Sequence, residues 1–134
     1  MLDASMALAW LFENEGTAAT DDVLRRVVFE GGIVPSLWRL EVANAFQIAI
    51  RRRRCDEGYA DRSLQYLTEL PIVTDDETDG HAWGAIKTLA REHGLSLYDA
   101  AYLELALRLQ RPLASCDAAL IAAAKASGLE VFSA

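Results

Sequence analysis

Four acidic residues, Asp3, Glu41, Asp99 and Asp117, stand where they could share one metal ion. Asp3 and Asp117 each follow a short apolar run and open a helical pattern, which places them where a strand ends and a helix begins. Asp99 and Glu41 lie within helical patterns of their own. Ligands of open α/β sheets bind outside the carboxyl ends of the strands, so Asp3 and Asp117 could face each other across such a crevice.

Glu41 carries the strongest single argument, because its side of the helix is apolar. Residues three, four and seven apart share one stripe of a helix. Glu41 and Asn44 share a stripe whose apolar members are Leu37, Ala45 and Ile48, and we expect this stripe to be buried. A lone carboxylate on a buried face is costly unless it is paired, hydrogen-bonded or bound to a cation. The position of Glu41 therefore requires a partner.

Helix capping is the alternative role for the three Asp residues. Asp is a preferred N-cap, so Asp3 and Asp117 could simply accept hydrogen bonds from free backbone N–H groups. Ser96 and Asp99 fit a capping box, with Asp in the usual place of Glu. Taken singly, each Asp is explained by either role.

A cation would resolve the conflict that four neighbouring carboxylates create. Like charges in one pocket repel one another and raise each other's pKa values. Oxygen ligands without His or Cys favour a hard ion, Mg²⁺ or Mn²⁺, which can orient phosphate, activate water and stabilise a leaving oxygen. The sequence offers no competing route through a Gly-x-Ser-x-Gly nucleophile or a Gly-rich phosphate loop.

The elements that must position these residues alternate along the chain. Short β-branched runs predict strands at residues 33–35, 71–74, 113–116 and 129–132. Longer patterns predict helices at residues 4–12, 17–30, 37–54, 56–70, 79–93, 97–109 and 118–127. Strands that alternate with helices indicate an α/β fold with a parallel sheet and helices on both faces. Only Met1 and Leu2 remain for the first strand, which is either a stub or begins upstream.

Length and composition limit the classes of protein. The 134 residues, 52% hydrophobic and 25% charged, predict one globular domain over residues 1–134. A net charge of −7 argues against a protein that coats nucleic acid by bulk positive charge. Two distant cysteines favour a reducing cytosol, and the apolar run at residues 4–12 is too short for a membrane span. We expect a soluble cytoplasmic protein with no membrane contact.

Four motifs, in order along the whole chain, resemble those of PIN domains. They are LDAS at residues 2–5, PSLWRLEVAN at 35–44, GLSLYDAAY at 94–102 and LASCDAAL at 113–120. The length is similar to that of the VapC toxins of bacterial and archaeal toxin–antitoxin pairs. The resemblance implies a single-domain three-layer α/β/α sandwich with a short parallel sheet.

The resemblance also implies an activity and a ligand set. PIN domains of this kind are endoribonucleases that use Mg²⁺ or Mn²⁺ to hydrolyse RNA, and Asp3, Glu41, Asp99 and Asp117 match the acidic quartet that holds the metal. Asp3 and Asp99 would make the most direct contacts, with Glu41 and Asp117 acting partly through water. Such toxins are inhibited by a cognate antitoxin and are commonly homodimers.

Three polar residues match supporting positions of the motifs. Ser5 and Ser115 lie two residues from the first and last Asp, and the resemblance implies that they orient carboxylates or a bound water. Ser115 stands where Thr is often found, which keeps the hydroxyl. Asn44 would hydrogen-bond beside Glu41 on the same helix.

Features outside the motifs have mostly ordinary explanations. The basic cluster Arg51, Arg52, Arg53 and Arg54 at a helix end either faces solvent or contacts RNA or an antitoxin. The acidic run at residues 75–79 is expected to be an exposed turn that precedes a helix. Trp10, Trp38 and Trp83 lie in apolar helical patterns and are expected in the core or an interface.

Two other functions compete with an endoribonuclease toxin. One is a catalytically silent PIN-fold binding module, which the retained quartet disfavours. The other is a PIN nuclease that processes RNA outside a toxin–antitoxin pair. A phosphoacceptor receiver domain needs an acidic pair after the first strand and a Lys after the last strand. This function is set aside, because only Asp3 follows the first strand and no Lys follows Val131.

Overall fold

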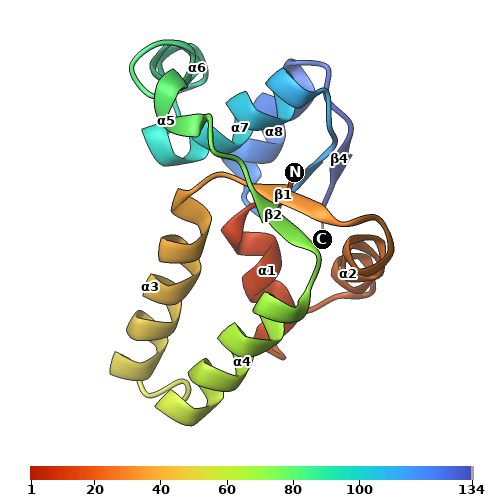
Figure 1. The fold of residues 1–134 in the computed structure, drawn as a ribbon, viewed down its shortest axis with the longest axis vertical. Coiled ribbons are helices and arrows are strands. Elements are labelled where there is room, and N and C mark those ends of the chain that lie inside the picture. The colour runs from red at the N-terminus through yellow and green to blue at the C-terminus, as the bar shows by residue number, and fades with distance from the viewer. Residues whose placement is uncertain (134) are drawn as a thin grey trace.

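Short parallel strands form the centre of the molecule in the computed structural model, which describes residues 1–133 (Figure 1). Strand β1 (Gly32–Val34) pairs with β2 (Ile72–Thr74), and β3 (Leu113–Ala114) pairs with β4 (Val131–Phe132). Both pairs are parallel, as the alternation of strands and helices predicts.

The first residues of the chain join the two strand pairs. The Leu2 N–H donates to the Ile33 carbonyl at 3.2 Å, and Leu2 forms a parallel bridge with Ala114. The Ala114 N–H donates to the Met1 carbonyl at 2.9 Å, and the Asp3 N–H donates to the Ala114 carbonyl at 3.1 Å. Residues 1–3 therefore lie as a short parallel segment between β1 and β3, and Asp3 stands at the carboxyl end of the sheet.

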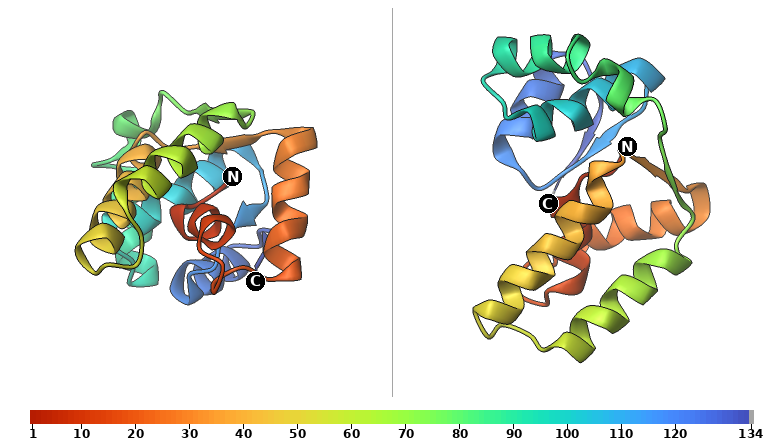
Figure 2. Two further views of the ribbon diagram at one scale, coloured as in Figure 1. Left: turned by 90° about the horizontal axis from the view of Figure 1, so that it is seen from below. Right: turned by 60° about the vertical axis from the view of Figure 1, so that its left-hand side comes forward.

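Eight helices surround the strands in the described part of the chain. They are α1 (Ala4–Leu11), α2 (Ala18–Glu30), α3 (Leu37–Arg51), α4 (Glu57–Glu69), α5 (Thr78–His81), α6 (Ala85–His93), α7 (Leu97–Leu109) and α8 (Ala118–Ala126). Helices α1 to α4 lie on one side of the strands and α5 to α8 on the other (Figures 1 and 2). The three-layer α/β/α arrangement is confirmed. None of the helices within residues 1–133 is both long enough and apolar enough to cross a bilayer.

The core lies where the helices meet the short strands. Its largest fully buried side chains are Tyr102, Phe46, Leu2, Met6, Leu103, Leu105, Leu113 and Leu120. Full burial of one such side chain contributes about 1.5–3 kcal/mol. The rings of Phe12 and Phe46 stack with centroids 5.3 Å apart and join α1 to α3. This packing fixes the relative positions of the helices that carry the acidic residues.

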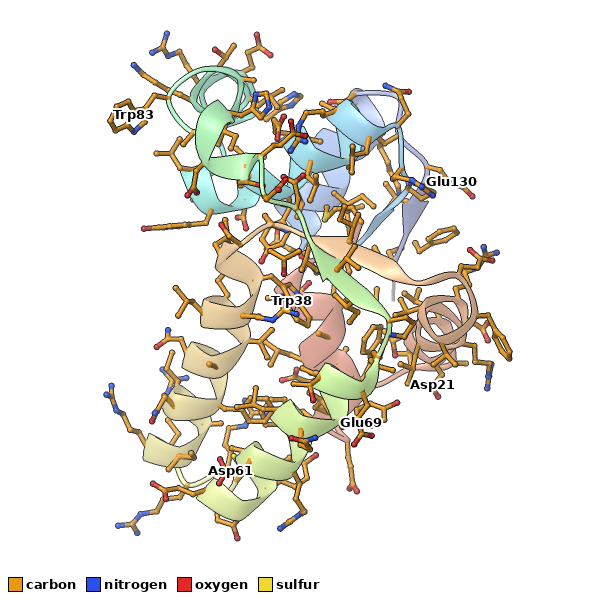
Figure 3. All side chains as sticks on the ribbon, viewed as in Figure 1. Asp21, Trp38, Asp61, Glu69, Trp83 and Glu130 are labelled. Carbon is orange, nitrogen blue, oxygen red and sulfur yellow. The ribbon has the colours of Figure 1, made fainter. Side chains whose placement is uncertain are left out.

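Two predicted helices differ from the structure. The single helix predicted over residues 79–93 is wrong, because the segment from Ala82 to Gly84 separates α5 from α6. Trp83 therefore lies outside any helical stripe, is 93% exposed and projects from the surface rather than packing in the core (Figure 3). The helix predicted over residues 37–54 ends at Arg51, and Arg53 has a positive φ of 59°. Gly94 and Gly128 follow the last residues of α6 and α8 and have positive φ of 63° and 80°, a conformation that glycine favours at helix ends.

Candidate metal centre

The four acidic residues come from four helices and line one cavity of about 320 Å³. Asp3 is the N-cap of α1, and Asp117 is the N-cap of α8. Glu41 lies in the second turn of α3, and Asp99 lies in the first turn of α7. Asn44 also lines the cavity. Residues separated by more than 100 positions in the chain thus open onto a common space.

Asp3 is the most firmly held of the four carboxylates. It is 4% exposed, and its Oδ1 accepts the Met6 N–H at 3.0 Å, which caps α1. The Ser5 hydroxyl donates to Oδ1 at 2.7 Å, and the Ser115 hydroxyl donates to Oδ2 at 2.6 Å. Capping is therefore real, but it uses only part of the carboxylate, and Asp3 still lines the cavity.

Ser5 and Ser115 connect Asp3 to the loop that follows β3. The Cys116 N–H donates to Ser5 Oγ at 2.8 Å, and the Asp117 N–H donates to Ser115 Oγ at 2.9 Å. The Asp117 carboxylate in turn accepts the Leu120 N–H at 2.8 Å and caps α8. The two hydroxyls thus hold the N-terminal ends of α1 and α8 next to each other.

Helix α7, which carries Asp99 in its first turn, is capped by Ser96. The Ser96 side chain accepts the Asp99 N–H at 3.1 Å, which forms one half of the predicted capping box. The carboxylate of Asp99 instead lines the cavity. Its position in the first turn of α7 therefore serves the cavity, while Ser96 provides the cap.

The helix face of Glu41 is a cavity wall and not part of the core, which corrects the prediction that this face is buried. Asn44 is exposed, and Ile48 is 40% exposed. The buried stripe of α3 contains Trp38 and Val42 instead. An apolar stripe looks the same in the sequence whether it packs against other side chains or borders an open hollow.

Tyr102 lines the same cavity and was not identified as a site residue from the sequence. Its hydroxyl donates to Glu41 Oε1 at 3.0 Å. The only available signal was its position three residues after Asp99, on the same side of α7. Burial and the neighbouring charge of Glu41 raise the pKa of Tyr102 well above its usual range, so the phenol is a neutral donor.

The electrostatics of the cavity favour a cation. Burial is the main cause that raises the pKa values of Asp3, Glu41 and Asp99, and neighbouring carboxylates raise them further. The charge of Asp117 acts on both Asp3 and Asp99. No Lys, Arg or His is found among the described residues that line the cavity. A set of carboxylate oxygens without a balancing charge fits a hard divalent ion.

A second acidic group lies after β2. Carboxylate oxygens of Asp75, Asp76 and Glu77 lie within 4.8 Å of one another, close enough to hold an ion, and they are the only three-residue group this compact in residues 1–133. However, the guanidinium of Arg108 already pairs with two members of this group. Arg108 contacts Asp75 at 2.7 Å and Glu77 at 3.3 Å, and its hydrogen bonds hold the pKa of Asp75 below the usual range.

The environment of this second group also corrects a prediction. The acidic run was expected to be wholly exposed, but Asp75 and Thr78 are buried. The Thr78 hydroxyl donates to Asp75 at 2.7 Å, and Arg108 also pairs with the buried Glu104 at 2.8 Å. The run therefore anchors β2 and α5 to α7 by ion pairs and hydrogen bonds.

The basic cluster lies away from the quartet, where α3 ends and turns toward α4. Arg51 is ten residues after Glu41, which corresponds to about 15 Å along the helix. Arg54 pairs with Glu15 at 3.2 Å and lies over the ring of Phe12. Arg51, Arg52 and Arg53 are exposed. Three of the four cations are thus available at the surface.

Comparison with known proteins identifies a family and related solved structures. The family model described as PIN domain matches residues 1–126. The crystal structure of PAE2754 from Pyrobaculum aerophilum superimposes with a TM-score of 0.70 at 26% sequence identity. The match covers 98% of this chain and 88% of PAE2754. No curated protein matches the sequence.

Proposed function

This chain belongs to the PIN domain family, and on that premise we propose that it is a metal-dependent endoribonuclease that hydrolyses RNA phosphodiester bonds. PIN domains are generally metal-dependent nucleases. The observation that supports the proposal is the convergence of Asp3, Glu41, Asp99 and Asp117 on one cavity, with no cationic side chain among the described residues that line it.

The four members of the quartet divide into two pairs with different roles in the proposal. Asp3 and Asp99 hold Mg²⁺ or Mn²⁺ directly, and Glu41 and Asp117 complete the site partly through water. Ser5 and Ser115 keep Asp3 oriented through their hydrogen bonds. When bound, the ion polarises the phosphate, activates a water molecule and stabilises the leaving oxygen. Asn44 offers an amide at the cavity wall.

The quartet is a better metal site than the group formed by Asp75, Asp76 and Glu77. An ion at the second group would have to displace Arg108 and break its pairs with the buried Asp75 and with Glu77. Breaking one side of a buried ion pair typically costs about 3–5 kcal/mol. The quartet has no such competitor among the described residues that line its cavity.

The test incubates purified protein with labelled total RNA in Mg²⁺, Mn²⁺ or EDTA. Asp3→Asn and Asp99→Asn are the site variants, and Asp76→Asn is the control, because Asp76 is an exposed acid of the second group. We expect discrete cleavage that requires metal, disappears in both site variants and persists in the control. Cleavage that survives in both site variants, or that needs no metal, contradicts the assignment.

Binding of the metal can be measured apart from cleavage. Mn²⁺ titrated by calorimetry should lose affinity in Asp99→Asn and keep it in Asp76→Asn. The reverse result would assign the ion to the group beside Arg108. No Mn²⁺ binding by the folded wild-type protein would count against a metal-dependent nuclease and favour a PIN-fold binding module.

We further propose that the protein is a cytoplasmic VapC-type toxin held inactive by a cognate antitoxin and assembled as a homodimer. The length of the chain and the order of the four motifs support this subtype. Induced expression should arrest growth of a bacterial host, whereas Asp99→Asn should not. Normal growth with active, well-expressed enzyme would favour an RNA-processing PIN nuclease. Light scattering tests the dimer directly.

The exposed arginines provide a surface for the RNA backbone or an antitoxin. Replacing Arg51, Arg52, Arg53 and Arg54 by Ala should weaken binding of one or both partners and leave Mn²⁺ affinity unchanged. If RNA is the partner, the slope of log affinity against log salt should fall by about one for each lost phosphate contact. Unchanged binding of both partners would show that the cluster only faces solvent.

A further inference from the structure

The Glu41 carboxylate is positioned very differently from that of Asp3. Asp3 receives hydrogen bonds from Met6, Ser5 and Ser115. In the described chain, the Tyr102 hydroxyl is the only hydrogen-bond donor to the Glu41 carboxylate. Glu also has one more rotatable side-chain bond than Asp, so it loses more conformational freedom when it is fixed.

We propose that Tyr102 is a positioning residue that fixes Glu41 as a metal ligand. The inference rests on the proposed metal-dependent function. The hydroxyl engages Oε1 at 3.0 Å, which leaves Oε2 of Glu41 free for an ion in the cavity. The same contact joins α3 to α7 and thereby sets Glu41 relative to Asp99, one turn before Tyr102.

The tyrosine is itself held rigidly. It is 1% exposed, so its ring is packed in the core while its hydroxyl reaches the cavity wall. Because the packed core already fixes the Tyr102 ring, its hydroxyl can hold the flexible Glu41 carboxylate in one orientation with little further loss of side-chain entropy. Partners of this kind, which hydrogen-bond a metal ligand, typically contribute 10–100-fold to metal affinity or activity.

A hydroxyl suits this task better than a charged group. The second acidic group illustrates the alternative, because Asp75 is held by the cation of Arg108. A guanidinium orients a carboxylate but also neutralises it, which weakens its attraction for a metal ion. Tyr102 orients Glu41 and leaves the negative charge of the cavity intact.

The test compares two tyrosine-to-phenylalanine variants in Mn²⁺ calorimetry. Tyr102→Phe removes only the hydroxyl and retains the ring. Tyr59→Phe is the matched control, because the Tyr59 hydroxyl donates to the Leu11 carbonyl and does not line the quartet cavity. We expect the Mn²⁺ dissociation constant to rise about 10-fold in Tyr102→Phe and to stay unchanged in Tyr59→Phe. The Mn²⁺ concentration that gives half-maximal cleavage should rise by the same factor, with the RNA KM unchanged.

A double-mutant cycle shows whether Tyr102 acts through Glu41. In a Glu41→Ala background, Tyr102→Phe should have no further effect on Mn²⁺ affinity. An equal loss in that background, or wild-type affinity in Tyr102→Phe alone, overturns the role of Tyr102 while Asp99→Asn still reports the metal site. Absence of Mn²⁺ binding in the wild-type protein would instead overturn the proposed function, and the role of Tyr102 with it.

Discussion

Ser115→Ala should destabilise the metal-free protein by about 2–4 kcal/mol, because one hydroxyl serves two partners. Ser115 is fully buried and donates to Asp3 at 2.6 Å. A hydrogen bond to a charged group contributes about 1.5–3 kcal/mol. The same oxygen accepts the Asp117 N–H at 2.9 Å, and a partly buried donor left without an acceptor costs about 1 kcal/mol. Domain stabilities of about 5–15 kcal/mol leave the variant folded.

The assay is urea unfolding at neutral pH, first without metal and then with Mg²⁺. Ser127→Ala is the control, because the Ser127 hydroxyl donates at 2.8 Å to the uncharged carbonyl of Ala123 at the end of α8. That variant should lose only about 0.5–1.5 kcal/mol. Ser115→Ala should also gain less stability from Mg²⁺ than the wild type, since the direct link from Asp3 through Ser115 to the Asp117 N–H is lost. Equal losses in the two variants, with equal Mg²⁺ effects, would refute this reasoning.

Three further predictions concern pH, an ion-pair network and a turn. Because the pKa values of Asp3, Glu41 and Asp99 are raised in the folded state, the folded metal-free protein binds more protons at these carboxyls than the unfolded chain does between about pH 4.5 and 6. Its urea midpoint should therefore fall as pH rises through that window, and Asp99→Asn or Mg²⁺ should reduce the fall; a midpoint that rises instead would contradict the assignment. Above that window the amino group of Met1, whose pKa burial lowers to about 6, acts in the opposite direction. Arg108→Leu removes the cation that pairs with the buried Asp75 and Glu104, and it should lower the free energy of unfolding by about 3 kcal/mol. Arg25→Ala, at an exposed ion pair, should lower it by only about 0–1 kcal/mol. Neither variant should change the Mn²⁺ affinity. Gly94→Ala should lower stability by about 1–2 kcal/mol because Gly94 has a φ of 63°, whereas Gly80→Ala, inside α5, should not; comparable thermal midpoints for the two variants would argue against the conformational cause.

The parts of the site that could be predicted from the sequence are those set by local rules. An Asp directly after a short apolar run is an N-cap in both α1 and α8, because capping depends only on the next three residues. The stripe of α3 that carries Glu41 follows from helical periodicity alone. The sequence could not tell whether that stripe was buried, because an apolar cavity wall and a core face share one pattern. Ile48 shows the difference, with 40% of its surface exposed.

Contacts between distant segments had no local signal. The Tyr102 hydroxyl contacts Glu41, 61 positions earlier in the chain, and Arg108 contacts Asp75, 33 positions earlier.

The apolar pattern around Trp83 fits the helical period, so the sequence predicted one continuous helix there. Gly84, with φ −111° and ψ −104°, takes the backbone out of the helical region there. Periodicity describes a helix but does not show where the chain leaves it.

Capping and metal binding are not alternatives in this fold, because the same geometry serves both. An N-cap uses one carboxylate oxygen for the backbone and can present the other beyond the end of the helix. Asp3 and Asp117 cap α1 and α8, and Asp99 lies in the first turn of α7. Three helix N-termini, each carrying partial positive charge, therefore meet at one cavity and offset part of the repulsion among its carboxylates. Burial, together with the charge of Asp117, nonetheless keeps the pKa values of Asp3 and Asp99 raised, and a bound cation would stabilise their charged forms.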